Sequence, residues 1–159
     1  VNVNQFSSGM QDLLTTHTDA RSIQLELDLS ARLPVSRFSK PHLEHILWNL
    51  VANAVDAMTG RGGHIRISTR RVDAGNAMLT VSDDGPGIAP EHLEKVQEPC
   101  FSTKSHGTGL GLSICRSIAW QCAGELEIES APGHGTAMRV RLPAMTPERP
   151  PPPAGPVRT

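Results

Sequence analysis

Apolar residues recur at every second position in parts of the chain, as in strands that bury one face. Between residues 22 and 30 the apolar positions are Ile23, Leu25, Leu27 and Leu29, with polar residues between them. Similar patterns, bounded by turn residues, predict further strands. The predicted strands cover residues 22–30, 64–72, 77–83, 125–130 and 136–142, and the last two form a hairpin around 132–135.

Two other stretches carry apolar residues at helical spacing. The longer one runs to Gly60 from a predicted N-cap at Ser39, with Pro41 in the first turn. The second covers residues 110–122, and Gly124 is predicted to end it. These elements predict an α+β fold. It would be a two-layer α/β sandwich, with a mixed, mainly antiparallel sheet of about five strands and about three helices on one face.

Length and charge narrow the class of protein. A chain of 159 residues suits one domain, and a net charge of -1 gives no reason to expect nucleic acid or a membrane surface as a partner. No apolar run approaches the roughly 20 residues needed to cross a bilayer. The cysteines, Cys100, Cys115 and Cys122, lack the paired spacing of a zinc site. We therefore expect a reducing compartment, the cytoplasm, even if the full-length protein carries a membrane anchor.

From Pro143 onward the chain is rich in proline and contains few apolar residues that could be buried. Seven of the 13 prolines stand from this residue onward. This composition is typical of a solvated, polyproline-like segment. We expect residues 144–159 to form a disordered tail or a linker.

Two asparagines occupy one side of the longer predicted helix. Asn49 and Asn53 are four residues apart, so their side chains lie on one stripe. Asparagine is a mediocre helix former, so propensity does not explain the pair. Their carboxamide oxygens would suit Mg²⁺, which binds oxygen donors together with water and substrate phosphates. A solvated polar flank of the helix is the alternative.

An acidic residue ends the predicted strand 77–83 on its apolar side. Asp83 shares a face with Leu79 and Val81, so its carboxylate needs a partner. The exocyclic amine of adenine would supply one, whereas guanine would present a carbonyl acceptor to an acceptor. Gly85 and Gly87 follow directly, and their backbone could lie against a flat ring. A simple turn after a strand is the alternative.

Three glycines at alternate positions, Gly107, Gly109 and Gly111, lead into the second predicted helix. Unpaired N–H groups and the helix dipole favour an anion there, and glycines let phosphate oxygens approach the backbone. Lys104, just upstream, adds a cation. A dinucleotide fingerprint would need a strand before the glycines, and a P-loop would need a lysine after the last one. Neither context is present, so the glycines are a candidate phosphate site of another kind.

The order of these motifs resembles that of the sensor histidine kinase catalytic domain. The successive segments are NLVANA, DDGPGI, EPCFSTK and GTGLGLSI, and ESAPGHGTAMRVRLP resembles the closing hairpin of that domain. NAVDAM resembles the nitrogen-regulation subgroup. The resemblance extends from near Ile23 to Pro143. It implies a Bergerat-type sandwich, which this family shares with DNA gyrase, mismatch-repair ATPases and a heat-shock chaperone.

The resemblance also implies a site for ATP and Mg²⁺ between the longer helix and a lid. Asn53 would hold the metal ion with Asn49 beside it. Asp83 would bind adenine, and Lys104 would meet the phosphates with the glycines. Asn49 and Lys104 are the candidate catalytic residues. The candidate nucleotide-binding residues are Asn49, Asn53, Asp83, Gly85, Gly87 (behind the ring), Ile88, Thr103, Lys104, Gly107, Thr108, Gly109, Leu110, Gly111, Leu112 and Thr136.

The chain also departs from the family's pattern. Asp56 stands where many members have a basic residue, which leaves phosphate neutralisation to Mg²⁺ and Lys104. None of the seven histidines is followed by Glu or Asp, so the family's phosphoacceptor segment is missing. We predict that residues 1–20 are the lead-in from a missing dimerisation and phosphoacceptor domain, and that residues 21–143 are the ATP-binding catalytic domain.

By the same resemblance, the γ-phosphate of ATP would pass to a histidine on a separate domain and then to a response regulator. The full-length protein would be a homodimer. A self-contained ATPase is disfavoured, because gyrase-like relatives have a glutamate as general base where this chain has Asn49. A serine kinase of the anti-sigma type and a non-catalytic ATP-binding module stay open as alternatives.

Overall fold

The computed structural model describes residues 1–5, 8–96 and 110–145. The predicted strands and both predicted helices are present close to their expected bounds. The elements, in chain order, are α1 (Ser8–Asp19), β1 (Ile23–Leu29), α2 (Lys40–Ala57), β2 (Gly63–Arg71), β3 (Asn76–Asp83), α3 (Pro90–Leu93), α4 (Gly111–Gln121), β4 (Glu125–Ser130) and β5 (Thr136–Pro143).

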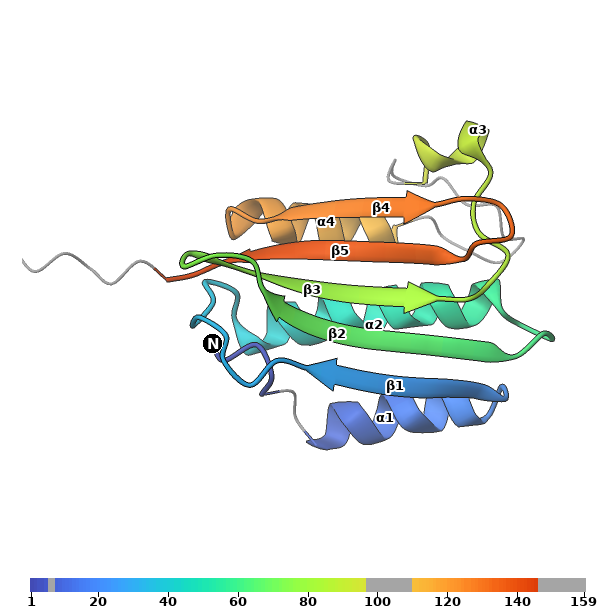
Figure 1. The fold of residues 1–159 in the computed structure, drawn as a ribbon, viewed down its shortest axis with the longest axis horizontal. Coiled ribbons are helices and arrows are strands. Elements are labelled where there is room, and N and C mark those ends of the chain that lie inside the picture. Colours follow the sequence, from blue (N-terminus) through green and yellow to red (C-terminus); the bar gives the residue numbers. More distant parts are fainter. Residues whose placement is uncertain (6–7, 97–109, 146–159) are drawn as a thin grey trace, which may run out of the picture.

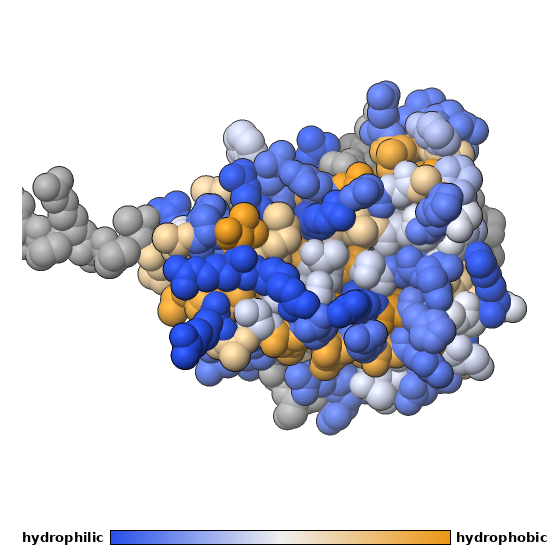
Figure 2. All heavy atoms as spheres, in the orientation of Figure 1, coloured by the Kyte–Doolittle hydropathy of each residue, from blue (hydrophilic) through white to orange (hydrophobic). Residues whose placement is uncertain are grey.

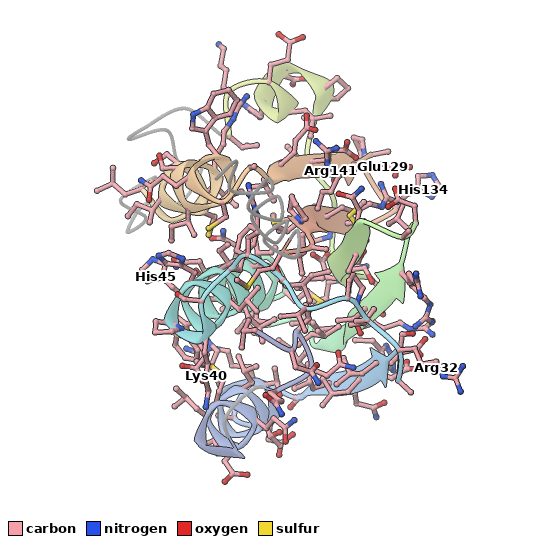
Figure 3. All side chains as sticks on the ribbon, turned by 90° about the vertical axis from the view of Figure 1, so that its left-hand side faces the viewer. Arg32, Lys40, His45, Glu129, His134 and Arg141 are labelled. Atoms are coloured by element: carbon pink, nitrogen blue, oxygen red, sulfur yellow. The ribbon has the colours of Figure 1, made fainter. Side chains whose placement is uncertain are left out.

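The strands form one five-stranded sheet in the order β1-β2-β3-β5-β4 (Figure 1). β1 runs parallel to β2, and the other neighbouring pairs are antiparallel. Seen edge-on in Figure 3, α1, α2 and α4 stack beside one another against one side of the sheet. The predicted α+β sandwich with a mainly antiparallel sheet is therefore confirmed.

The core lies between the two layers, because every second strand residue points toward the helices. Ile65 and Ile67 of β2 and Leu79 of β3 are fully buried there. They meet an apolar stripe of α2 that repeats at helical spacing. The buried residues of that stripe are Leu43, Ile46, Leu47, Leu50, Val51, Ala54 and Val55.

The opposite face of the sheet carries mainly polar residues with apolar ones between them, as the space-filling view in Figure 2 shows. Its arginines pair with acidic residues on neighbouring strands. Arg66 and Arg70 of β2 both contact Asp28 of β1, and Arg141 of β5 lies 3.1 Å from a Glu125 carboxylate oxygen of β4. Such exposed pairs keep this face solvated and contribute little to stability.

The predicted first residue of α2 agrees with the structure, whereas the predicted last residue of α4 does not. The Ser39 hydroxyl accepts a hydrogen bond from the His42 N–H at 3.3 Å, which confirms the predicted N-cap of α2. Gly124 was expected to end α4, but the residue in the left-handed conformation is Ala123, with φ 57°. Gly124 is needed for a different reason, because a Cβ there would collide with the Arg141 carbonyl oxygen and crowd the Phe38 ring.

The N-terminal residues pack against the sandwich. Val3 and Leu14 are buried in the same core as the sheet residues, and α1 contacts β1 and α2. The derivation of residues 1–20 from a preceding domain stays a prediction. Residues 146–159 of the predicted tail lie outside the described residues. Among the helices that the structure describes, none is both long and apolar enough to cross a bilayer.

Candidate functional site

The predicted site residues come from three elements that meet at one end of the molecule. The C-terminal end of α2, the start of α4 and the end of β3 lie at the same side of Figure 1. Met58, at the end of α2, is fully buried, and its Cγ would lie 3.1 Å from a Cβ placed on Gly85 after β3. The asparagine helix is therefore packed directly against the segment that follows Asp83.

Asn49 connects α2 to the start of α4. Its Nδ2 donates a hydrogen bond to the His45 carbonyl oxygen at 2.8 Å, one turn earlier in the helix. A Cβ on Gly111, the first residue of α4, would lie 2.9 Å from the Asn49 Oδ1 atom. The third glycine of the predicted phosphate loop thus gives room to the first asparagine of the predicted metal pair.

Asn53 lies one helical turn after Asn49 and is half-buried. Over residues 1–5, 8–96 and 110–145, no group of three or more His, Cys, Asp or Glu side chains could hold a metal ion. The amide oxygen of Asn53 is a suitable donor for Mg²⁺, but a single neutral ligand needs oxygen atoms from water or phosphate to complete the shell. The donor set fits a metal ion that arrives with a phosphate-bearing ligand.

Asp83 ends β3 on the helix side of the sheet and is half-buried. Burial raises the pKa of its carboxyl, while hydrogen bonds from the backbone N–H groups of Gly85 and Thr136 oppose that rise, and the neighbouring Asp84 adds to it. The Gly85 N–H lies 2.9 Å from Asp83 Oδ1. The two backbone N–H groups occupy only part of the acceptor sites of a carboxylate, so Asp83 can accept a hydrogen bond from a further donor.

Gly87 has a packing role that the sequence did not reveal. Its φ is +75°, and a Cβ there would collide with the Ala131 carbonyl oxygen in the turn between β4 and β5. Gly135 in that turn has φ +71° and would collide in the same way with the Asp83 carbonyl oxygen. Two glycines therefore let the segment after β3 dock against the β4–β5 turn. A contact of Gly87 with a purine ring stays a prediction.

Ser130 contacts two predicted site residues, and sequence analysis missed it. Its Oγ accepts a hydrogen bond from the Ile88 N–H at 2.8 Å and lies 2.8 Å from the Thr136 Oγ1 atom. It also donates to the Gly135 carbonyl oxygen at 2.8 Å. A serine at the end of a strand carries no pattern that distinguishes it, so only the tertiary structure shows that it joins two predicted site residues.

The predicted phosphate site includes the start of α4. Within residues 1–5, 8–96 and 110–145, the Ncap residue of this helix is Leu110, and its side chain makes no capping hydrogen bond. Leu112 is half-buried and packs against the core, so it attaches the start of α4 to the hydrophobic core. The other predicted residues of this loop lie outside the described residues. They are Thr103, Lys104, Gly107, Thr108 and Gly109.

The family model described as "Histidine kinase-, DNA gyrase B-, and HSP90-like ATPase" matches residues 39–146, which include all three site elements. The chain belongs to this ATPase family. Family membership implies an ATP site, in agreement with the acid, amide and glycine residues gathered at one end of the sandwich.

Several relatives in this family are sensor kinases. Sensor histidine kinase ZraS of Salmonella typhimurium is 33% identical over 145 residues, which cover 91% of this chain and 31% of ZraS. Sensory histidine kinase/phosphatase NtrB of Vibrio alginolyticus is 32% identical over 154 residues, which cover 91% of this chain and 43% of NtrB. The chain therefore spans about a third of ZraS and less than half of NtrB.

A solved structure shares the whole architecture. The catalytic domain of histidine kinase ThkA superimposes with a TM-score of 0.77 at 28% identity, covering 90% of this chain and 93% of that domain. Because both chains are covered almost completely, the described sandwich corresponds to one catalytic domain.

Proposed function

We propose that this chain is the ATP-binding catalytic domain of a two-component sensor histidine kinase. The observation that carries the proposal is the chemistry of Asn49. Its amide nitrogen donates to the His45 carbonyl oxygen, and its amide oxygen faces Gly111. An amide cannot take a proton from water, so a domain with Asn49 at this position suits phosphoryl transfer to another group better than hydrolysis.

Each element of the site would hold one part of ATP. Asp83 accepts a hydrogen bond from the adenine amine. Asn53 would hold Mg²⁺, which would neutralise phosphate charge, and the start of α4 together with Lys104 would bind the phosphates. An acceptor imidazole nitrogen then attacks the γ-phosphorus. The new P–N bond forms as the bond from the γ-phosphorus to the bridging oxygen breaks. ADP leaves with that oxygen, and the N–H proton of the other ring nitrogen passes to solvent water.

The acceptor histidine belongs to a separate phosphoacceptor domain, and a response regulator receives the phosphoryl group next. The similarity to NtrB supports the nitrogen-regulation subgroup. We further propose that the full-length protein acts as a homodimer and that this domain works in the cytoplasm. The phosphoacceptor domain and the homodimer concern parts of the relatives that the present chain does not span.

The decisive experiment uses ATP labelled at the γ-phosphate. The 159-residue chain should bind Mg·ATP, hydrolyse it slowly and stay unlabelled. A chimera with the phosphoacceptor domain of ZraS joined before Val1 should acquire label that is lost in acid, as a phosphohistidine is. Strong labelling of the chain alone, or acid-stable label, would contradict the proposal.

The metal assignment has its own test. The Asn53→Ala variant should lose most of the increase in ATP affinity that Mg²⁺ gives the wild-type chain, because the amide oxygen is removed. Asn76→Ala, at the opposite end of β3 from Asp83, serves as the control and should keep the increase. An unchanged Mg²⁺ dependence in Asn53→Ala would place the metal ion on other residues.

A further inference from the structure

The hydroxyl of Ser130 has three hydrogen-bond partners, and this number fixes the direction of each bond. The partners are the Ile88 N–H, the Gly135 carbonyl oxygen and the Thr136 hydroxyl, all at 2.8 Å. A serine hydroxyl has one proton to donate and two lone pairs to accept. The carbonyl oxygen can only accept and the N–H can only donate.

The proton assignment follows from these limits. Ser130 gives its single proton to the Gly135 carbonyl oxygen and uses one lone pair for the Ile88 N–H. The contact with Thr136 is then satisfied when the Thr136 hydroxyl donates to the second lone pair of Ser130. The Thr136 oxygen therefore keeps lone pairs but has no proton for another partner.

Thr136 lies beside the residue that we assign to adenine. Thr136 and Asp83 are directly opposite in the β5–β3 pairing, and Thr136 is 8% exposed. Opposite residues of antiparallel strands point to the same face with Cβ atoms about 4.5–5.5 Å apart. Two acceptors, the Asp83 carboxylate and the Thr136 oxygen, therefore stand together on the helix side of the sheet.

We infer that Ser130 is a positioning residue that determines purine specificity, by holding the Thr136 hydroxyl as an acceptor beside Asp83. This inference rests on the proposed function. A base edge that carries an amine, as adenine does, supplies donors to this pair, directly or through a water molecule. A base with a carbonyl at the same position meets two acceptors and is disfavoured.

The test compares dissociation constants of the 159-residue chain for ATP and inosine triphosphate, which has a carbonyl in place of the amine. The Ser130→Ala variant frees the Thr136 proton, so the preference for ATP should fall about two- to tenfold, the range of one hydrogen bond. Thr136→Val should lower the preference for ATP similarly, and the double variant should show little additional loss.

Two variants serve as controls. Ser130→Thr keeps the hydroxyl and should retain the preference for ATP. Ser117→Ala removes an exposed serine of α4 and should also leave the preference unchanged.

The ratio of the two constants separates specificity from stability, because partial unfolding weakens both ligands equally. Equal weakening of both triphosphates by Ser130→Ala and Thr136→Val would overturn the inference. Asp83→Asn tests the proposed function in parallel. If Asp83→Asn lowers the preference and the other two variants do not, the adenine assignment stands and the role of Ser130 is wrong. If Asp83→Asn keeps the full preference, the adenine assignment itself is wrong.

Discussion

At the scale of single residues, the glycines of this site serve packing as much as backbone conformation. Gly111 does not have a positive φ, yet a Cβ there would lie 2.9 Å from Asn49 Oδ1. The atom in the way is the end of a flexible side chain, which can rotate at small cost to the fold. The glycine therefore matters for where Asn49 points.

Gly111→Ala should consequently weaken Mg·ATP binding about tenfold, while the free energy of unfolding in urea stays within about 0.5 kcal/mol of wild type. The physical reason is that the methyl group displaces the Asn49 oxygen, whereas alanine is well accepted in a helix. Isothermal titration and urea unfolding measure the two effects. Gly9→Ala in α1, where a Cβ meets nothing within 4 Å, is the matched control and should bind ATP normally.

Asp83 should make the ligand-free chain less stable as the pH rises. Burial raises the pKa of its carboxyl above the ordinary 3.8, so the folded state keeps the proton longer than the unfolded state. The unfolding free energy then falls as pH increases from about 4 through the raised pKa. Urea unfolding at pH 4 and pH 7 should show wild type losing stability relative to Asp83→Asn. A constant difference between the two proteins would contradict this.

At the scale of elements, one side of α1 packs against the core of the domain and the other side is exposed to solvent. Leu14 is 2% exposed and lies in the core, whereas its neighbour Leu13 is 51% exposed. Leu14→Ala should lower the free energy of unfolding by about 2–5 kcal/mol, because a cavity forms between α1 and the sheet. Leu13→Ala should change it by no more than about 0.5 kcal/mol. Similar values for both would mean that α1 does not pack as described.

At the scale of the whole molecule, one core links the nucleotide site to global stability. Cys115 of α4 is 1% exposed, its Sγ lies 4.0 Å from the Ile46 carbonyl oxygen of α2, and burial raises its pKa to about 12. A thiol with this pKa and no access to solvent reacts with labelling reagents only after the helices separate.

In a Cys100→Ser, Cys122→Ser background, thiol labelling of Cys115 should therefore follow unfolding. ATP at about 100 times its dissociation constant, with Mg²⁺, should slow the labelling about 100-fold, because the ligand binds only the folded state. GTP at the same concentration should protect much less. Rapid labelling that ATP does not change would contradict the link between the site and the core.

The sequence alone determined α2, α4, the five strands and the nature of the ligand, whereas α1 and α3 were not predicted by range. The spacing of apolar residues depends only on the period of a helix or strand, so α2, α4 and the strands could be predicted from local pattern. The types and order of Asn49, Asn53, Asp83 and the glycines carried the resemblance to an ATP-binding domain. Only the tertiary structure decided why Gly87 and Gly111 are glycines, which residue ends α4, and that Ser130 joins Ile88 to Thr136. Those features depend on contacts between segments far apart in the chain, which no local pattern encodes.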